Sequence, residues 1–142
     1  MARIMDGEGL NTLKMWDNIS NSELEVYYRA PTTEERTAFS NESIQRKRNK
    51  IFFRTSQARQ KFGLKILEGI REGDFLIKKG SKKVSLASDP KSPNYDPEWK
   101  NLMMKHAADI VELLAVHVFE APAETLDEEA ADDLIAEDAE KN

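Results

Sequence analysis

The chain has 142 residues, of which 39% are hydrophobic and 33% are charged, and its formal net charge at pH 7 is −5. It contains no cysteine, which excludes disulfides, thiol nucleophiles and cysteine-ligated zinc or iron–sulfur sites and fits a reducing compartment. No apolar run approaches the roughly 20 residues that a membrane span requires. We therefore expect a soluble, cytoplasmic protein with no membrane partner.

The charges are sorted into blocks along the chain. Residues 45–83 hold 13 lysines and arginines against 3 acids, a net charge of +10, whereas residues 121–142 hold 1 lysine against 9 acids, a net charge of −8. Such sorting is typical of a protein that binds partners. No catalytic or cofactor motif rises above background, so we predict no enzyme, no catalytic residue, no cofactor and no metal.

The predicted fold is α+β: a mostly helical single domain over residues 12–120 with two β-hairpins. A flexible arm over residues 1–11 precedes it, and a disordered acidic tail over residues 121–142 follows it. Alternating apolar residues around a turn-forming segment predict the first hairpin; they are Leu13, Met15, Leu24, Val26 and Tyr28. Next, Thr32 and Glu35 have the spacing of a capping box, which predicts a helix start.

Apolar residues then recur at helical spacing and predict a middle helix. The apolar stripe consists of Ile44, Ile51, Thr55, Ala58, Phe62, Ile66 and Ile70. One helix over residues 33–71 would be unusually long for a small domain, so two helices are favoured over one. The break would fall near Thr55 or at Gly63, since a glycine inside a helix costs about 1 kcal/mol relative to alanine.

Residues 75–79 and 82–86 predict a second hairpin with Gly80 in its turn. Residues 97–119 predict one amphipathic helix, capped by Asp96, that packs as the central core helix on the apolar stripe of the middle helix, with the hairpins at the edge.

Both histidines of the chain, His106 and His117, fall on the apolar face of this last helix. Each has an acid three residues later, Asp109 or Glu120, which is a spacing used in helical metal sites. No third histidine and no cysteine completes a ligand set. Neutral core or interface histidines are therefore the favoured interpretation.

Basic residues at helical spacing predict the binding surface. Lysines and arginines recur every three or four residues, with Gln57 in the one gap, across the predicted helix from the apolar stripe; they are Arg46, Lys50, Arg54, Lys61 and Lys65. The row would cover about 28 Å. It suits a phosphate backbone, a protein partner or the chain's own acidic tail, or it is only a solvated helix face. Phe52 and Phe53 lie partly outside the apolar stripe and either close a second side of the core or offer an exposed patch for self-association.

One segment carries a family resemblance. Leu24-Glu25-Val26-Tyr27-Tyr28-Arg29-Ala30-Pro31-Thr32-Thr33-Glu34-Glu35-Arg36 is a short strand that leads through Pro-Thr into a glutamate-rich helix start. In this motif, and in size, helical content and acidic C-terminal extension, the chain resembles the small tail assembly chaperones of tailed phages. The resemblance implies a non-enzymatic role in the host cytoplasm. Several copies would coat the long helical tape measure protein, keep it soluble and recruit tail tube subunits.

We therefore predict a binding or assembly protein whose partner is another protein, either further copies of itself as a homo-oligomer or a long helical client. The predicted contact residues are Arg46, Lys50, Phe52, Phe53, Arg54, Lys61 and Lys65. The alternative is a small nucleic-acid-binding or regulatory protein that uses the basic helix face and is modulated by the acidic tail.

Overall fold

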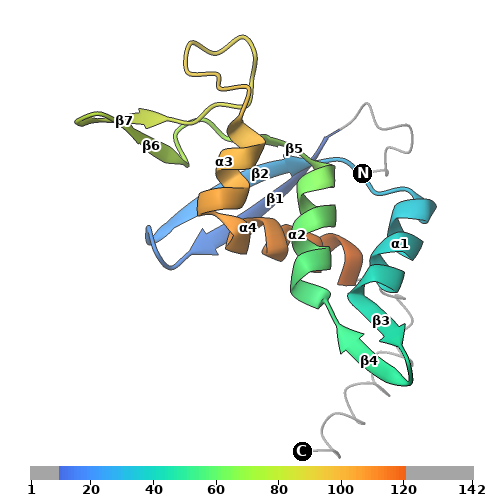
Figure 1. Ribbon diagram of the computed structural model, residues 1–142. Coiled ribbons are helices and arrows are strands. Elements are labelled where there is room, and N and C mark those ends of the chain that lie inside the picture. Colours follow the sequence, from blue (N-terminus) through green and yellow to red (C-terminus); the bar gives the residue numbers. More distant parts are fainter. Residues whose placement is uncertain (1–9, 121–142) are drawn as a thin grey trace, which may run out of the picture.

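The computed structural model of the protein describes residues 10–120 (Figure 1). Most of the predicted arm and the whole predicted tail lie outside these residues. The elements, in chain order, are β1 (Asn11–Asp17), β2 (Ser22–Tyr28), α1 (Thr33–Ser43), β3 (Ile44–Lys47), β4 (Lys50–Phe53), α2 (Thr55–Ile66), β5 (Leu67–Ile70), β6 (Leu76–Lys79), β7 (Lys82–Ser85), α3 (Trp99–His106), α4 (Ala108–Ala115) and the π-helix η1 (Val116–Glu120).

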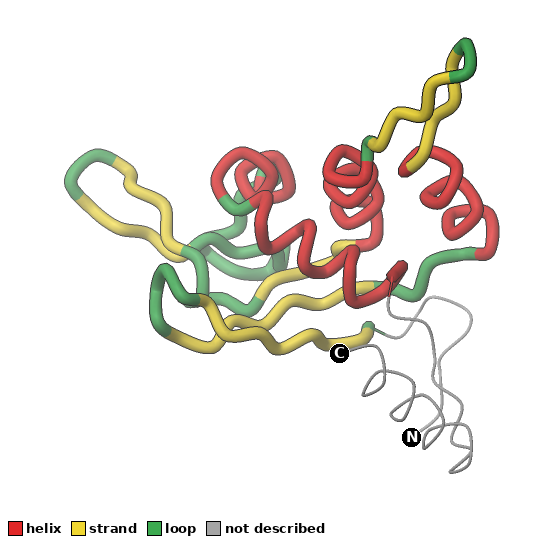
Figure 2. Tube along the Cα trace, turned by 90° about the horizontal axis from the view of Figure 1, so that it is seen from below, coloured by secondary structure: helices red, strands yellow, loops and turns green. Residues whose placement is uncertain are grey.

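The strands of the described residues form three antiparallel sheets. One has three strands in the order β1-β2-β5, and the other two are the hairpins β3–β4 and β6–β7. Figure 2 shows the helices together on one side of the three-stranded sheet, with the two hairpins projecting from opposite ends of the molecule. The fold is therefore a helix layer on a small sheet with two projecting arms.

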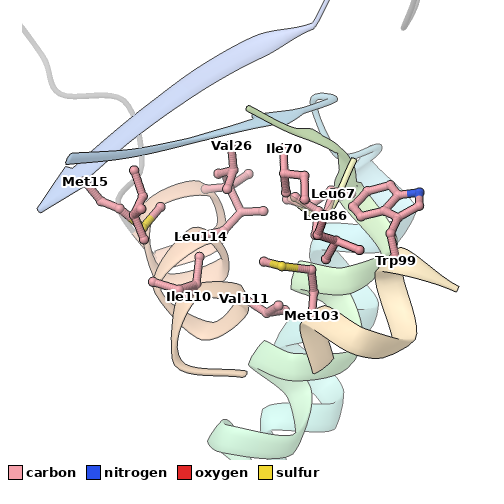
Figure 3. Close-up of a cluster of buried hydrophobic side chains, with 13 residues drawn as sticks. Met15, Val26, Leu67, Ile70, Leu86, Trp99, Met103, Ile110, Val111 and Leu114 are labelled. Carbon is pink, nitrogen blue, oxygen red and sulfur yellow. The ribbon is translucent and has the colours of Figure 1, made fainter. Parts of the chain in front are cut away.

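The main core lies between the three-stranded sheet and the helices (Figure 3). Alternate residues of β1 and β2 face it, so the predicted first hairpin is confirmed, but this hairpin is part of the core sheet and does not lie at the edge. Buried side chains from both layers meet there; they include Met15, Leu24, Val26, Ile66, Leu67, Ile70, Leu86, Trp99, Met103, Ile110, Val111 and Leu114.

Helix α1 starts at the predicted capping box. Glu35 N donates to Thr32 Oγ1 at 3.1 Å, and Thr32 N donates to Glu35 Oε1 at 2.9 Å. Both carboxylate oxygens of Glu35 also accept hydrogen bonds from the guanidinium of Arg29, at 2.7 and 2.8 Å. The Arg29 guanidinium and the capping bonds lower the pKa of Glu35 from 4.5 to about 2.

This lowered pKa gives a prediction for acid stability. Ionised Glu35 stabilises the fold above its ordinary pKa, and the contribution is lost as the pH falls from about 4.5 towards 2. At pH 7 we expect Glu35→Gln to lower the free energy of unfolding by about 2 kcal/mol. Urea unfolding at pH 7, 5 and 3 measures this loss, which should shrink towards pH 3. The exposed neighbour Glu34→Gln is the control and should change little; a Glu35→Gln loss that is equal at all three pH values would contradict the mechanism.

The structure contradicts the mostly helical prediction. Among the described residues 40% are helical and 31% are in strands, so the fold is α+β without helical predominance. The segment from Ile44 to Phe53, predicted as helix, forms the hairpin β3–β4, and residues 67–70 form strand β5. Neither one long helix nor two adjacent helices fills residues 33–71, because α1 and α2 are separated by a hairpin.

The prediction of one last helix is also wrong. Backbone angles of φ −137° and ψ 40° at Ala107 separate α3 from α4, and α3 begins at Trp99 with the Asp96 carboxylate accepting from Glu98 N at 2.9 Å. His106 and His117 are both exposed, so their predicted place at the centre of the apolar face is wrong as well. The His117 ring packs edge-on against Tyr28, with 6.2 Å between the ring centroids.

The predicted second hairpin, β6–β7, and its Gly80 turn at φ 67° are confirmed.

Helix α4 packs closely on α2, as predicted for the last and middle helices. Gly63 lies at the contact, where a Cβ atom on it would stand 2.5 Å from the main-chain oxygen of Val111. Beside this contact a second, aromatic cluster joins α1, α2 and η1 through Phe39, Phe62 and Phe119. These contacts hold together α1 and α2, the two helices that the hairpin β3–β4 connects.

Candidate functional site

The hairpin β3–β4 is built by a two-residue turn. Arg48 and Asn49 both have positive φ, 47° and 67°, which is the type I′ geometry that suits the right-handed twist of a hairpin. Asparagine tolerates this region of backbone conformation better than most residues. At the base, Arg54 N donates to the main-chain oxygen of Ser43 at 2.8 Å, so the hairpin is joined directly to α1 and α2.

One face of this hairpin carries three large apolar residues that are open to solvent. Ile44 is paired opposite Phe53, and Ile51 lies two residues before Phe53 on β4, so the three side chains share a face. Their exposed fractions are 53% for Ile44, 51% for Ile51 and 75% for Phe53, and Phe52 on the opposite face is 45% exposed. A surface cluster of large apolar side chains on a projecting arm is typical of a binding surface.

The same hairpin is strongly basic. Residues 44–54 contain no acid and five cations; these are Arg46, Lys47, Arg48, Lys50 and Arg54. Among the residues that the structure describes, neither Lys50 nor Arg54 forms an ion pair with a carboxylate, and both are exposed. We call Ile44, Lys50, Ile51, Phe52, Phe53 and Arg54 the hairpin surface. It combines desolvatable apolar groups with positive charge.

The structure gathers some of the predicted contact residues and separates others. Arg46 lies on β3, Lys50, Phe52 and Phe53 lie on β4, and Arg54 follows β4 directly. Lys61 and Lys65 lie on α2, where Lys61 pairs with Glu42 at 2.8 Å and both ammonium groups approach the Phe62 ring. The predicted basic row along one helix face is therefore wrong, because its first half belongs to a hairpin.

Sequence reasoning assigned Ile44 and Ile51 to the core, whereas the structure exposes both. The sequence did not indicate that Ile44 lies opposite Phe53, or that Ile51 shares their face, because the turn lacks glycine, the usual signal of a tight hairpin. The strand character of Ile51-Phe52-Phe53, a run of β-branched and aromatic residues, is the local signal that favours this hairpin.

Two further observations concern the described part of the chain. Within residues 10–120 no three histidine, aspartate or glutamate side chains come close enough together to hold a metal ion. No helix in this same range is long and apolar enough to cross a membrane.

Comparison of the chain with protein-family models, with curated proteins and with solved structures finds no match.

Proposed function

We propose that the protein is a non-enzymatic binding and assembly protein that holds a protein partner through the hairpin surface. The observation that carries the proposal is the shared, exposed face of Ile44, Ile51 and Phe53. Burying an aromatic or aliphatic anchor in a partner's pocket is the main source of affinity in protein interfaces, and a basic rim selects a partner with acids around that pocket.

The partner is a further copy of the protein or a long helical client. A projecting hairpin inserts between the helices of a client or into a copy's surface without a change in its own fold, since the tight turn and the Arg54–Ser43 bond keep it preformed. Because the chain resembles phage tail assembly chaperones, the client that we propose is a tape measure protein in the host cytoplasm. Several copies on one client would then bury the apolar faces that are exposed on the isolated chain.

A second candidate function is nucleic-acid binding by the same hairpin. The observation that favours it is the density of cations, five within residues 44–54 without an acid, on a two-stranded ribbon. A two-stranded β-ribbon fits the major groove of duplex DNA. The log of the affinity would then fall as the log of the salt concentration rises, with a slope of about −0.9 for each phosphate contacted. Fluorescence anisotropy with labelled duplexes at 50 and 200 mM salt distinguishes this role from protein binding.

The test of the proposed function is Phe53→Glu. Because Phe53 is 75% exposed, the substitution should leave the thermal midpoint of unfolding unchanged. It should weaken self-association, or binding to a purified helical tape measure protein, by about 30-fold or more, since loss of a buried aromatic anchor costs about 2 kcal/mol. Sedimentation velocity over a concentration series measures this.

The matched control is Lys61→Glu, a charge change on α2 away from the hairpin surface. It should weaken association by less than about fivefold, because exposed ion pairs contribute little. Equal effects of the two substitutions would contradict a contact centred on the hairpin. A protein that stays monomeric at every concentration and also ignores the helical client would contradict the proposal as a whole.

A further inference from the structure

A groove with a volume of about 500 Å³ lies between β6 and α3, away from the hairpin surface. On one side it is lined by five consecutive residues, 74–78, and on the other by residues of α3 such as Leu102, Met103 and His106. No residue of β7 lines it. Leu86, the residue after β7, also lines it, so the groove lies at the base of the hairpin, between β6 and α3. Strand β6 also has an edge that does not pair with β7.

The main chain of β6 has unused hydrogen-bonding groups at this edge. Leu86 N donates to Phe75 O at 2.7 Å, and the bonding direction alternates along an antiparallel strand. The N–H and C=O groups of Ile77 and Lys79 therefore point towards β7, while those of Leu76 and Lys78 point away from it, and both of these residues line the groove. Among the described strands β6 pairs with β7 alone, so this edge can receive another strand.

The walls of the groove are apolar. Leu86 and Met103 reach it from the main core, where Figure 3 shows them close together, and Phe75, Ile77 and Leu102 pack against that core. The one carboxylate in the lining, that of Asp74, accepts hydrogen bonds from the Arg71 guanidinium at 3.0 Å and from Glu25 N at 2.8 Å. Its charge is therefore compensated within the fold.

The rim of the groove is positive. The hairpin β6–β7 carries four exposed lysines, and residues 75–86 contain no acid; the lysines are Lys78, Lys79, Lys82 and Lys83. Lys78 and Lys83 are directly opposite each other and share a face, which is the face that carries Leu76. A strand added along β6 would place every second side chain on this positive face and the others against α3.

We propose that this groove binds an extended segment of a partner protein in which acidic and apolar residues alternate, as a third strand on β6. The main chains of Leu76 and Lys78 would pair with the segment, its apolar side chains would contact Leu102 and Met103, and its acids would face Lys78 and Lys83. The site does not depend on the hairpin surface. With the two arms at opposite ends of the molecule (Figure 1), one protein holds two partners at once.

A pair of proline substitutions tests the proposal in the full chain. Lys78→Pro and Lys83→Pro each remove one lysine from the same face and one N–H that is not bonded within the hairpin, but only the N–H of Lys78 lies on the free edge of β6. The probe is the fluorescein-labelled peptide Asp-Val-Asp-Leu-Glu-Val-Asp-Leu, followed by fluorescence anisotropy. Lys78→Pro should weaken binding about tenfold or more, whereas Lys83→Pro should weaken it less than about threefold. Far-ultraviolet circular dichroism verifies that both variants are folded.

Two further peptides report on the binding mode. N-methylation of the odd residues blocks one edge of the peptide strand, and N-methylation of the even residues blocks the other, so only one of the two should lose binding. Equal losses, equal effects of the two prolines, or no binding of the unmodified peptide would overturn the proposal. Displacement of the probe by an equal concentration of a peptide of residues 126–138 would assign the groove to the chain's own acidic segment and overturn the assignment to a partner. Phe53→Glu should leave peptide binding unchanged, which separates this site from the proposed function.

Discussion

Replacing Gly63 with alanine is expected to lower the thermal midpoint of unfolding by about 8 °C. A Cβ atom at this position would stand 2.5 Å from Val111 O and 2.9 Å from Val111 Cγ1, and 3.3 Å from Ala115 Cβ. The closest of these atoms is a main-chain oxygen of α4, which cannot turn aside as a side chain would. Helix α4 would have to move as a unit away from α2.

The expected size follows from two opposing effects. Alanine in a helix interior gains about 1 kcal/mol over glycine, while an overpacked contact between main chains costs about 3 kcal/mol, which leaves a net loss of about 2 kcal/mol. Differential scanning calorimetry measures the shift in midpoint. Gln57→Ala, at an exposed position of the same helix, is the control and should be neutral or slightly stabilising. A Gly63→Ala variant as stable as the parent would show that α2 and α4 are not in such close contact.

Phe119→Ala is expected to destabilise the fold strongly. The Phe119 ring stacks on Phe39 with a centroid separation of 4.7 Å and meets Phe62 at 5.9 Å, so three elements lose a shared contact. We expect a loss of about 3 kcal/mol in the free energy of unfolding, measured by urea denaturation.

The control for this truncation is Leu113→Ala on α4. Leu113 is exposed, so its removal should cost less than about 1 kcal/mol. If both substitutions cost the same, the aromatic cluster does not hold η1 against α1 and α2.

Local signals made part of the fold predictable. The hairpin β1–β2 alternates apolar and polar residues, and the box at Thr32 and Glu35 needs only residues three apart. The hairpin β3–β4 was missed because Ile44, Ile51 and later apolar residues also fit a helical period. The break at Ala107 has no local signal, since alanine is the strongest helix former, and the buried residues of α3 and α4 belong to one core cluster.

Gly63 illustrates the difference between a residue's local and tertiary roles. Read locally, it was a candidate helix break, yet it lies inside α2 and permits the approach of α4. The candidate site shows the same limit. Phe52 and Phe53 could be identified as either core or patch from the sequence, but only the register opposite Ile44 shows that an apolar face is formed and exposed.

The lysines of the hairpin β6–β7 have a consequence for fibre formation. An unpaired strand edge is a template on which identical chains can stack into aggregates. If two copies of this protein joined β6 to β6, Lys78 and Lys79 of one arm would approach the same lysines of the other, with Lys82 and Lys83 of each copy one strand further away, and these like charges would repel. The same charges attract an acidic strand. Charge repulsion thus opposes the pairing of two identical chains at the free edge of β6, whereas a strand of opposite charge can still pair there.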